Sequence, residues 1–232
     1  MYHYTVHACG VDRDLYRFPF ELVNSNMYFI PSGENGIVID PNENEELLGV
    51  FEKCGTKQVV IVLTHEHYDH TIGVSWLQSK IESKLFCHQA CAASITTEKG
   101  NNPKTLAILL TIRDAADGGN RRDEFMATAK RYVLQADETF DGIYDLTVDD
   151  ITLNCYPAPG HSQGSAIYIL GEKNVITGDS LIQDTPTILK LPGSDKMAFK
   201  QITKPFLKSL DKDCMIFPGH GEPFSIKDAK YL

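Results

Sequence analysis

Short runs of apolar residues alternate with turn residues along the N-terminal part of the chain. Strands are predicted at 4–9, 20–30 and 36–40, and a turn with proline and glycine is predicted at 31–35. The segment 58–63, QVVIVL, is apolar and β-branched almost throughout, which is typical of a buried strand. This part of the sequence therefore predicts a β meander that leads into a buried strand.

Apolar residues spaced three or four positions apart predict helices in the rest of the chain. The predicted helices lie at 44–54, 71–81, 89–97, 103–115, 121–131 and 194–210. Further strands are predicted at 84–88, 151–156, 165–170, 174–177 and 214–217. In the last helix, Phe199, Ile202 and Phe206 form the predicted buried face, and lysines recur along one side.

The order of these elements predicts an α/β protein with a single domain over residues 1–232. Two strand-rich halves are each followed by helices, and this order fits sheets that are covered by helices. Residues from about 89 to 131 add helices between the halves, and we predict that this helical insertion forms a wall or a lid over a site. Its basic residues, such as Arg121 and Arg122, either favour an anionic substrate or belong to solvated helix faces.

Composition and charge narrow the classes of function. The 232 residues are 42% hydrophobic and 23% charged, as in an ordinary soluble globular protein. The formal net charge of −9 argues against general binding to nucleic acids or anionic membranes, and we expect a small-molecule substrate. Six scattered cysteines without a Cys-x-x-Cys pair predict reduced core residues. We see no secretory signal or membrane-spanning stretch in the sequence and expect a cytoplasmic protein.

The strongest chemical signal is the hexapeptide HEHYDH at 65–70, which directly follows the buried strand. It places three imidazoles and a carboxylate where a strand meets a polar loop, and this combination is typical of transition-metal ligands. Because residues two apart on an extended chain point to the same face, His65 and His67 can share one ion, while Asp69 and His70 turn toward another. Histidines also cluster by accident on solvated loops, but four potential ligands in six positions predict a metal site.

Three later segments each place a potential ligand beside a glycine at the end of a predicted strand. They are PGHS at 159–162, TGDS at 177–180 and PGHG at 218–221, which contain His161, Asp179 and His220. Glycine allows tight turns that direct a neighbouring side chain inward. Each segment alone is compatible with a structural turn, but together with the hexapeptide they supply the ligands that two metal sites need. Asp40 ends another strand and is either a structural residue or a hydrogen-bond partner of a ligand histidine.

The four segments, in this order, resemble those of the metallo-β-lactamase-fold hydrolase superfamily. The segment NGIVIDP at 35–41 extends the resemblance over nearly the whole chain. The resemblance implies a four-layer αβ/βα sandwich, with two sheets face to face and helices outside. It assigns His65, His67 and His161 to a first metal ion, Asp69, His70 and His220 to a second, and Asp179 to a bridge between them.

The resemblance also implies a reaction. Two divalent ions, zinc by preference with iron or manganese as alternatives, would share a bridging hydroxide that attacks the substrate, and Asp69 would orient it. The motif THEHYDH at 64–70 is similar to that of glyoxalase II, a thioester hydrolase, whereas Asp179 as an oxygen bridge is unlike the true β-lactamases. We therefore expect a metal-dependent hydrolase of a small ester, thioester or lactone. Lys190 and Lys196, which flank the loop after Asp179, are the predicted substrate contacts.

Two other functions fit the same ligands. A phosphodiesterase would use the basic residues of the insertion to hold an anionic phosphate ester, although the acidic total counts against RNA as the substrate. A non-hydrolytic iron protein, such as a sulfur dioxygenase or a redox module, fits because imidazole and carboxylate also bind iron.

Overall fold

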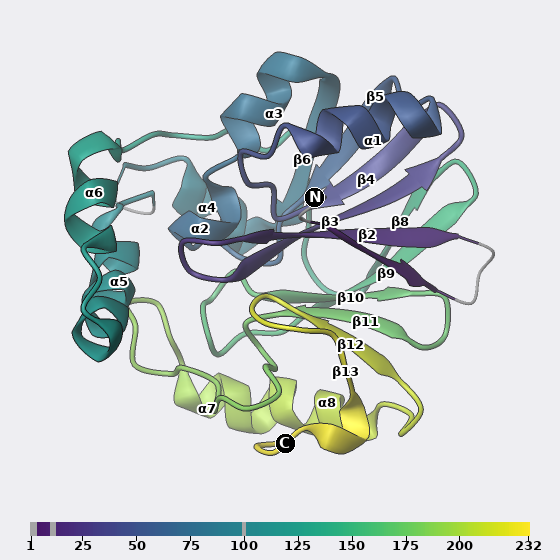
Figure 1. Ribbon diagram of the computed structural model, residues 1–232. Helices are drawn as coiled ribbons and strands as arrows, with labels where there is room; N and C mark the ends of the chain where they lie inside the picture. Colours follow the sequence, from purple (N-terminus) through teal and green to yellow (C-terminus); the bar gives the residue numbers. More distant parts are fainter. Residues whose placement is uncertain (1–3, 10–12, 99–100) are drawn as a thin grey trace.

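Two β-sheets packed face to face form the centre of the molecule, and helices cover their outer faces (Figure 1). The computed structural model describes residues 4–9, 13–98 and 101–232. Its arrangement confirms the predicted α/β class and the four-layer αβ/βα sandwich.

In the described part of the chain, the first sheet has seven strands that follow one another in chain order. They are β1 (Thr5–Ala8), β2 (Asp14–Phe20), β3 (Ser25–Ser32), β4 (Asn35–Ile39), β5 (Gln58–Val62), β6 (Glu82–His88) and β7 (Glu138–Phe140). Neighbours from β1 to β4 pair antiparallel as a meander, and those from β4 to β7 pair parallel. Because parallel strands run in one direction, the C-terminal ends of β4, β5 and β6 lie at the same edge.

The prediction of a strand at 20–30 is wrong for residues 21–24. Residues 21–24 form a turn between β2 and β3, and Asn24 in this turn has a left-handed backbone with φ of 60°. The apolar side chains of Leu22 and Val23 make the run look continuous in the sequence. They leave the sheet and pack with the helices of the insertion, so the prediction merged a hairpin turn with the following strand.

The second sheet has six strands in the order β13-β12-β11-β10-β9-β8. They are β8 (Tyr144–Val148), β9 (Ile151–Pro157), β10 (Ala166–Leu170), β11 (Asn174–Gly178), β12 (Met215–Pro218) and β13 (Phe224–Ser225). β8 to β11 pair antiparallel, and β11 pairs parallel with β12. β9, β11 and β12 therefore run in the same direction and end at one edge of this sheet.

Three apolar cores hold the layers together. The facing sides of the two sheets form the central core, which includes Tyr28, Tyr168 and Phe217. The helices on the outer faces are α1 (Glu46–Cys54), α3 (Val74–Lys80) and α4 (Gln89–Ile95) on the first sheet, and α7 (Lys196–Ala198) and α8 (Lys204–Ser209) on the second. Separate apolar cores lie under the helices of each sheet.

The last helix departs from its predicted buried face. Residues Phe199–Thr203 form a π-helical turn between α7 and α8. A π turn is wider than an α turn, so the apolar stripe is rotated after it. As a result Ile202 is 51% exposed, while Thr203 and Leu207 are buried.

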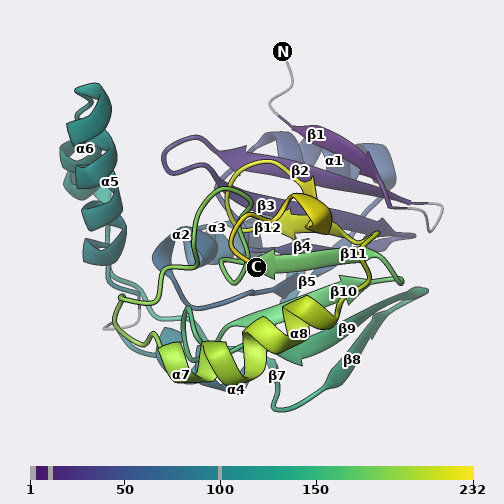
Figure 2. The ribbon, with the colours of Figure 1, turned by 90° about the horizontal axis from the view of Figure 1, so that it is seen from below.

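The described residues of the predicted insertion, from about 89 to 131, form three helices in two different places. α4 packs on the outer face of the first sheet. In contrast, α5 (Lys104–Asp117) and α6 (Arg121–Thr128) form a hairpin that stands beside the body of the molecule (Figure 2). A small apolar cluster around Tyr68 joins this hairpin to the rest of the chain.

All six cysteines are free thiols, as the sequence predicts, and only Cys54 is not fully buried. Among the helices that the structure describes, none is both long enough and apolar enough to cross a membrane.

Candidate metal centre

The seven predicted metal ligands come together where the two sheets meet at one edge. Four follow β5 and one each follows β9, β11 and β12: these are His65, His67, Asp69 and His70, then His161, Asp179 and His220. Asp69 and His70 lie in a short helix, α2 (Tyr68–Thr71), which begins earlier than the predicted helix 71–81. The sheets are tied together beside the cluster, because Ala166 N donates a hydrogen bond of 2.8 Å to Thr64 O.

One group of ligand atoms consists of three imidazole nitrogens. His67 Nδ1 lies 3.0 Å from His65 Nε2 and 2.9 Å from His161 Nε2. Two nitrogens bound to one tetrahedral zinc ion at about 2.0–2.1 Å are roughly 3.3 Å apart, so the separation is close to that of a shared ion. The three side chains therefore form a potential metal site.

A second group consists of one carboxylate and two imidazoles. Asp69 Oδ2 lies 3.2 Å from His220 Nε2 and 3.5 Å from His70 Nε2. These three atoms form another potential metal site, beside the first. The ligands again come from both sheets, because His220 belongs to the second sheet and the other two follow a strand of the first.

Asp179 lies between the two groups. Its Oδ2 is 3.4 Å from His161 Nε2 and 3.5 Å from His220 Nε2. Its Oδ1 is 3.5 Å from His70 Nε2. One carboxylate thus reaches ligand atoms of both groups, which is the position that a bridging ligand requires.

Orphaned polar atoms show that the cluster fits metal ions. Asp69 Oδ2, His70 Nε2 and Asp179 Oδ1 are buried without a hydrogen-bond partner. A buried polar atom without a partner costs about 1–3 kcal/mol, so three in one cluster are costly unless a ligand satisfies them. Imidazole and carboxylate donors without a thiolate suit zinc, iron and manganese. The residues present therefore fit a divalent metal centre.

Asp40 orients one of the ligand histidines. It is buried, and its backbone adopts a left-handed conformation with φ of 51° at the end of β4. Its Oδ2 accepts a hydrogen bond of 2.8 Å from His70 Nδ1, and its Oδ1 accepts one of 2.7 Å from Thr64 N. His70 Nε2 is thereby directed toward the cluster, which is the role of a hydrogen-bond partner in many metal sites. The sequence left this role and a purely structural one open.

Backbone carbonyls orient two further histidines in the same way. His161 Nδ1 donates to Ile188 O at 3.0 Å, and His220 Nδ1 donates to Val23 O at 3.1 Å. Because a carbonyl oxygen only accepts hydrogen bonds, Nδ1 carries the proton in both rings. Nε2 is therefore the nitrogen that faces the cluster in both rings, and it can bind a metal ion when it carries no proton.

The three-imidazole group is neutral at pH 7 in the metal-free chain. Burial, together with repulsion between neighbouring histidines, lowers the pKa of His65 well below the usual 6.5 and that of His67 to about 3. Burial also lowers the pKa of His161. A metal ion that binds here therefore meets neutral imidazoles and displaces no titrating proton.

In the second group, Asp69, His70 and His220, the two histidines are instead protonated at pH 7 in the metal-free chain. Burial opposes protonation of His70, but the carboxylates of Asp69, Asp179 and Asp40 outweigh burial and raise its pKa to about 9. Burial is likewise outweighed at His220, where Asp179 and Asp69 raise the pKa well above the usual value. A metal ion that binds here must displace protons from both histidines.

These pKa shifts predict how the stability of the metal-free protein depends on pH. Protonated His70 stabilises the native state below pH 6.5, and this contribution is lost as pH rises toward 9. The lowered pKa of His67 acts at low pH, because its buried ring is neutral in the native state but takes up a proton in the unfolded chain. Stability is therefore also lost as pH falls from 6.5 toward 3. We expect the melting temperature of chelator-treated protein to fall by several degrees between pH 6.5 and pH 9.

The metal-loaded protein is the control for this measurement. Its ligand histidines are neutral imidazoles that cannot take up a second proton while a metal ion is bound, so its melting temperature should not fall over the same range. Equal pH profiles for the metal-free and metal-loaded proteins would contradict the assignment of the raised pKa to His70.

Sequence reasoning missed a polar network that holds the His220 loop. Arg17 is 2% exposed, and its Nε donates to Asn26 Oδ1 at 2.8 Å. Asn26 Nδ2 and Tyr28 OH both donate to Pro218 O, at 2.9 and 2.7 Å. These residues of the first sheet thus fix a loop of the second. The only signal in the sequence is that Arg17 and Asn26 interrupt apolar strands, and this does not identify their partners.

Glu66, inside the hexapeptide, was also given no role by the sequence. Ser162 Oγ donates a hydrogen bond of 2.8 Å to Glu66 Oε2. Burial raises the pKa of Glu66. This hydrogen bond joins the hexapeptide to the turn that carries His161, so Glu66 holds two ligand segments in register.

The predicted substrate contacts lie outside the cluster. Lys190 and Lys196 are both exposed. Lys190 follows Ile188, whose carbonyl holds His161, and Lys196 begins α7. The structure therefore places both lysines near the segment that supports His161 but brings neither to the ligand atoms that it describes.

Comparison with protein families matches residues 21–220 to the family described as the metallo-beta-lactamase superfamily. The chain is 26% identical to a protein of Bacillus subtilis named "Probable metallo-hydrolase YqgX", over 88% of this chain and 89% of that protein. It is also 26% identical to the hydroxyacylglutathione hydrolase GloC of Haemophilus influenzae, over 85% of each chain.

Two solved structures share the fold. The B3 metallo-beta-lactamase BLEG-1 superposes with a TM-score of 0.74 at 21% identity, over 92% of this chain and 95% of that chain. The protein TTHA1623, solved in a di-iron-bound form, superposes with a TM-score of 0.64 at 24% identity, over 91% of this chain and 94% of that chain.

Proposed function

The chain belongs to the metallo-beta-lactamase superfamily, and from this premise we propose that it is a dinuclear metal-dependent hydrolase of a small ester, thioester or lactone. The observation that carries the proposal is the position of Asp179, whose two oxygens lie within 3.5 Å of ligand nitrogens in both groups. One ion would be held by His65, His67 and His161, the other by Asp69, His70 and His220, with Asp179 between them.

The metal ions and the side chains would supply different parts of the chemistry. When bound, the ions supply Lewis acidity toward a carbonyl oxygen and activate water as a nucleophile at neutral pH. Burial raises the pKa of Asp69, but the neighbouring His70 and His220 outweigh it and hold the pKa at about 2. Asp69 is therefore ionised at neutral pH and can accept a hydrogen bond from the attacking water, which orients it.

Two observations support acyl substrates over phosphate esters. The relative named hydroxyacylglutathione hydrolase aligns over 85% of its own length, which supports a thioester. Two arginines of the insertion are already paired: Arg121 contacts Asp117 at 2.8 Å and Arg122 contacts Asp123 at 2.7 Å. They therefore offer little free positive charge to a phosphate. We propose Lys190 and Lys196, both exposed, as contacts for an anionic part of the substrate.

Zinc is the proposed metal, and iron is the alternative that a specific observation favours. The di-iron-bound TTHA1623 has the same fold. The imidazole and carboxylate donors of this chain suit either metal, so a non-hydrolytic iron protein is the second candidate function.

Metal analysis combined with a substrate panel tests the proposal. We expect two divalent ions per chain, and faster hydrolysis of an acyl thioester or a lactone than of bis(p-nitrophenyl) phosphate or a β-lactam. Fastest turnover of the phosphodiester would replace the acyl hydrolase with a phosphodiesterase. Bound iron, oxygen consumption and no hydrolysis of any panel member would replace it with an oxidative function.

A further inference from the structure

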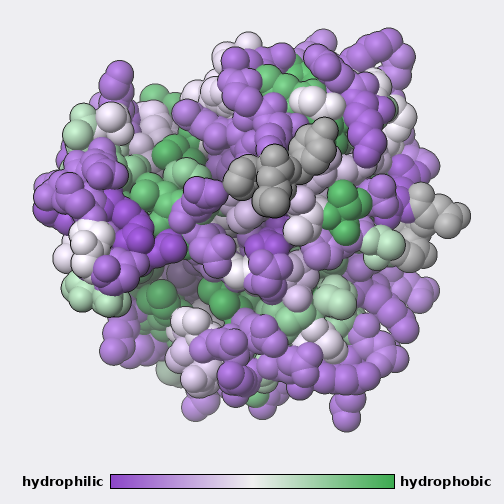
Figure 3. All heavy atoms as spheres, viewed as in Figure 1, coloured by the Kyte–Doolittle hydropathy of each residue, from purple (hydrophilic) through white to green (hydrophobic). Residues whose placement is uncertain are grey.

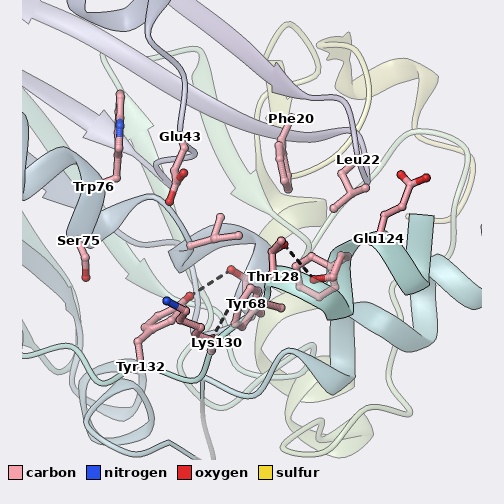
Figure 4. A pocket seen from close by; sticks show the side chains of 13 residues that line it. Phe20, Leu22, Glu43, Tyr68, Ser75, Trp76, Glu124, Thr128, Lys130 and Tyr132 are labelled. Atoms are coloured by element: carbon pink, nitrogen blue, oxygen red, sulfur yellow. Dashed lines mark hydrogen bonds between the residues drawn. The ribbon is translucent and has the colours of Figure 1, made fainter. Parts of the chain in front are cut away.

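A hollow of about 680 Å³ lies on the other side of α2 from the metal cluster. Its walls are formed by the end of β2 and the turn after it, the loop between β4 and α1, α2, α3, α6 and the linker after α6 (Figure 4). Its volume falls within the usual range of small-molecule sites, about 300–1,000 Å³. None of the seven proposed metal ligands lines it, so it is a separate site.

Aromatic side chains dominate the walls of this hollow. They are Phe20, Tyr68, Trp76, Phe125 and Tyr132. Apolar side chains reach the surface on this face of the molecule, beside the α5–α6 hairpin (Figure 3). Aromatic ring faces carry negative partial charge and attract cations within about 6 Å. Trp76 already has one cation beside its ring, because Lys80 Nζ lies 5.8 Å from the ring centroid.

An unpaired carboxylate adds a formal negative charge to the aromatic walls. Glu43 points into the hollow, between Trp76 and Phe20 (Figure 4). It is exposed, and no ion pair engages it in the part of the chain that the structure describes.

We propose that this hollow is a second binding site, which takes a small organic cation with an apolar body. The ammonium group would lie at Glu43 against the aromatic rings, and the apolar body would cover Tyr68 and Phe125. Lys130, the one basic residue among the described lining residues, is exposed and lies beside Tyr132, where it disfavours a second positive charge (Figure 4). Glu124, the other carboxylate of the lining, lies beside Leu22 and away from Glu43 (Figure 4). The site therefore selects a single cationic group joined to an apolar chain or ring.

The hollow and the metal cluster share α2, which contributes residues to both. Tyr68 faces the hollow and donates a hydrogen bond of 2.9 Å to Lys130 O, while its neighbour Asp69 belongs to the cluster. Tyr132, which also lines the hollow, has its hydroxyl 2.8 Å from Thr71 Oγ1 in the same helix. A ligand that contacts Tyr68 and Tyr132 thus touches the segment that carries two proposed metal ligands.

Trp76 is the only tryptophan in the chain and lies in the wall, so its fluorescence reports directly on occupancy. We would titrate the protein with 4-phenylbutylamine, with 4-phenylbutan-1-ol and with 4-phenylbutanoate, which share one apolar body and differ in charge. The expected result is that the amine binds roughly five- to tenfold more tightly than the alcohol, and that the carboxylate binds most weakly. Equal affinities, or tighter binding of the carboxylate, would overturn the proposal.

Two variants assign the charge preference to this hollow. Glu43→Gln should remove the preference for the amine while leaving the affinity for the alcohol unchanged. Glu52→Gln, an exposed carboxylate on α1 outside the lining, is the matched control and should keep the preference. Retention of the preference in Glu43→Gln would overturn the proposal. The titration needs neither metal nor turnover, so its outcome is independent of the proposed hydrolase activity.

Discussion

Asp179→Asn is expected to lower hydrolysis by roughly 100-fold or more while the fold is retained. Asparagine keeps the size of the side chain but loses the charge and one of the two oxygens that face the two ligand groups. Loss of a group that only orients a ligand typically costs 10- to 100-fold in metal affinity or activity, so loss of a bridging ligand should cost at least the upper value. The metal content should fall from two ions per chain toward one.

Turnover, metal content and circular dichroism on the same preparation check this prediction. Asp145→Asn is the matched control, because Asp145 is an exposed carboxylate on β8 that accepts a hydrogen bond from Asn154 at a distance of 2.8 Å. This variant should keep full activity and metal content. If Asp179→Asn retained two ions and full turnover, Asp179 would not be the bridging ligand.

Gly219→Ala is expected to disrupt the metal centre although only one methyl group is added. An ideal Cβ at Gly219 would overlap Asp179 Oδ1 and would lie 3.0 Å from His70 Cε1 and 2.9 Å from Gly178 C. The backbone of Gly219 is not in the left-handed region, so the effect comes from close approach alone. The methyl group must displace Asp179, and we expect loss of metal together with at least about 100-fold lower hydrolysis.

Gly49→Ala is the matched control for this substitution. Gly49 lies within α1, and nothing comes within 4 Å of an added Cβ. Alanine in a helix is favoured over glycine by up to about 1 kcal/mol, so this variant should be active and slightly more stable in urea unfolding. Wild-type metal content in Gly219→Ala would show that the cluster tolerates displacement of Asp179.

Local patterns were sufficient to predict the strands that carry the ligands. The run at 58–63 forms β5, in which Val59, Ile61 and Val62 are buried. Glycines mark the ends of β11 and β12, where Asp179 and His220 lie. These features depend on neighbours in sequence, namely apolar runs and turn residues, and a single chain displays them.

Features that depend on distant partners could not be predicted in this way. The buried Arg17 reaches Glu222, in the loop between β12 and β13, at 2.5 and 2.7 Å, and no local pattern indicates that pairing. The π-helical turn at Phe199–Thr203 changed which side of the last helix is buried. The aromatic hollow was missed for the same reason, since its walls come from segments between Phe20 and Tyr132 that are far apart in the chain.

The division of each ligand group between the two sheets also affects how the protein folds. His65 and His161 belong to one group, and Asp69 and His220 to the other, so each group joins residues that are far apart in the chain. Contacts of such high sequence separation form late, because loop-closure entropy must be paid before they stabilise the chain. Interactions that are absent from the folding transition state slow unfolding without accelerating folding. Bound metal is therefore expected to prolong the lifetime of the native state rather than to hasten its formation.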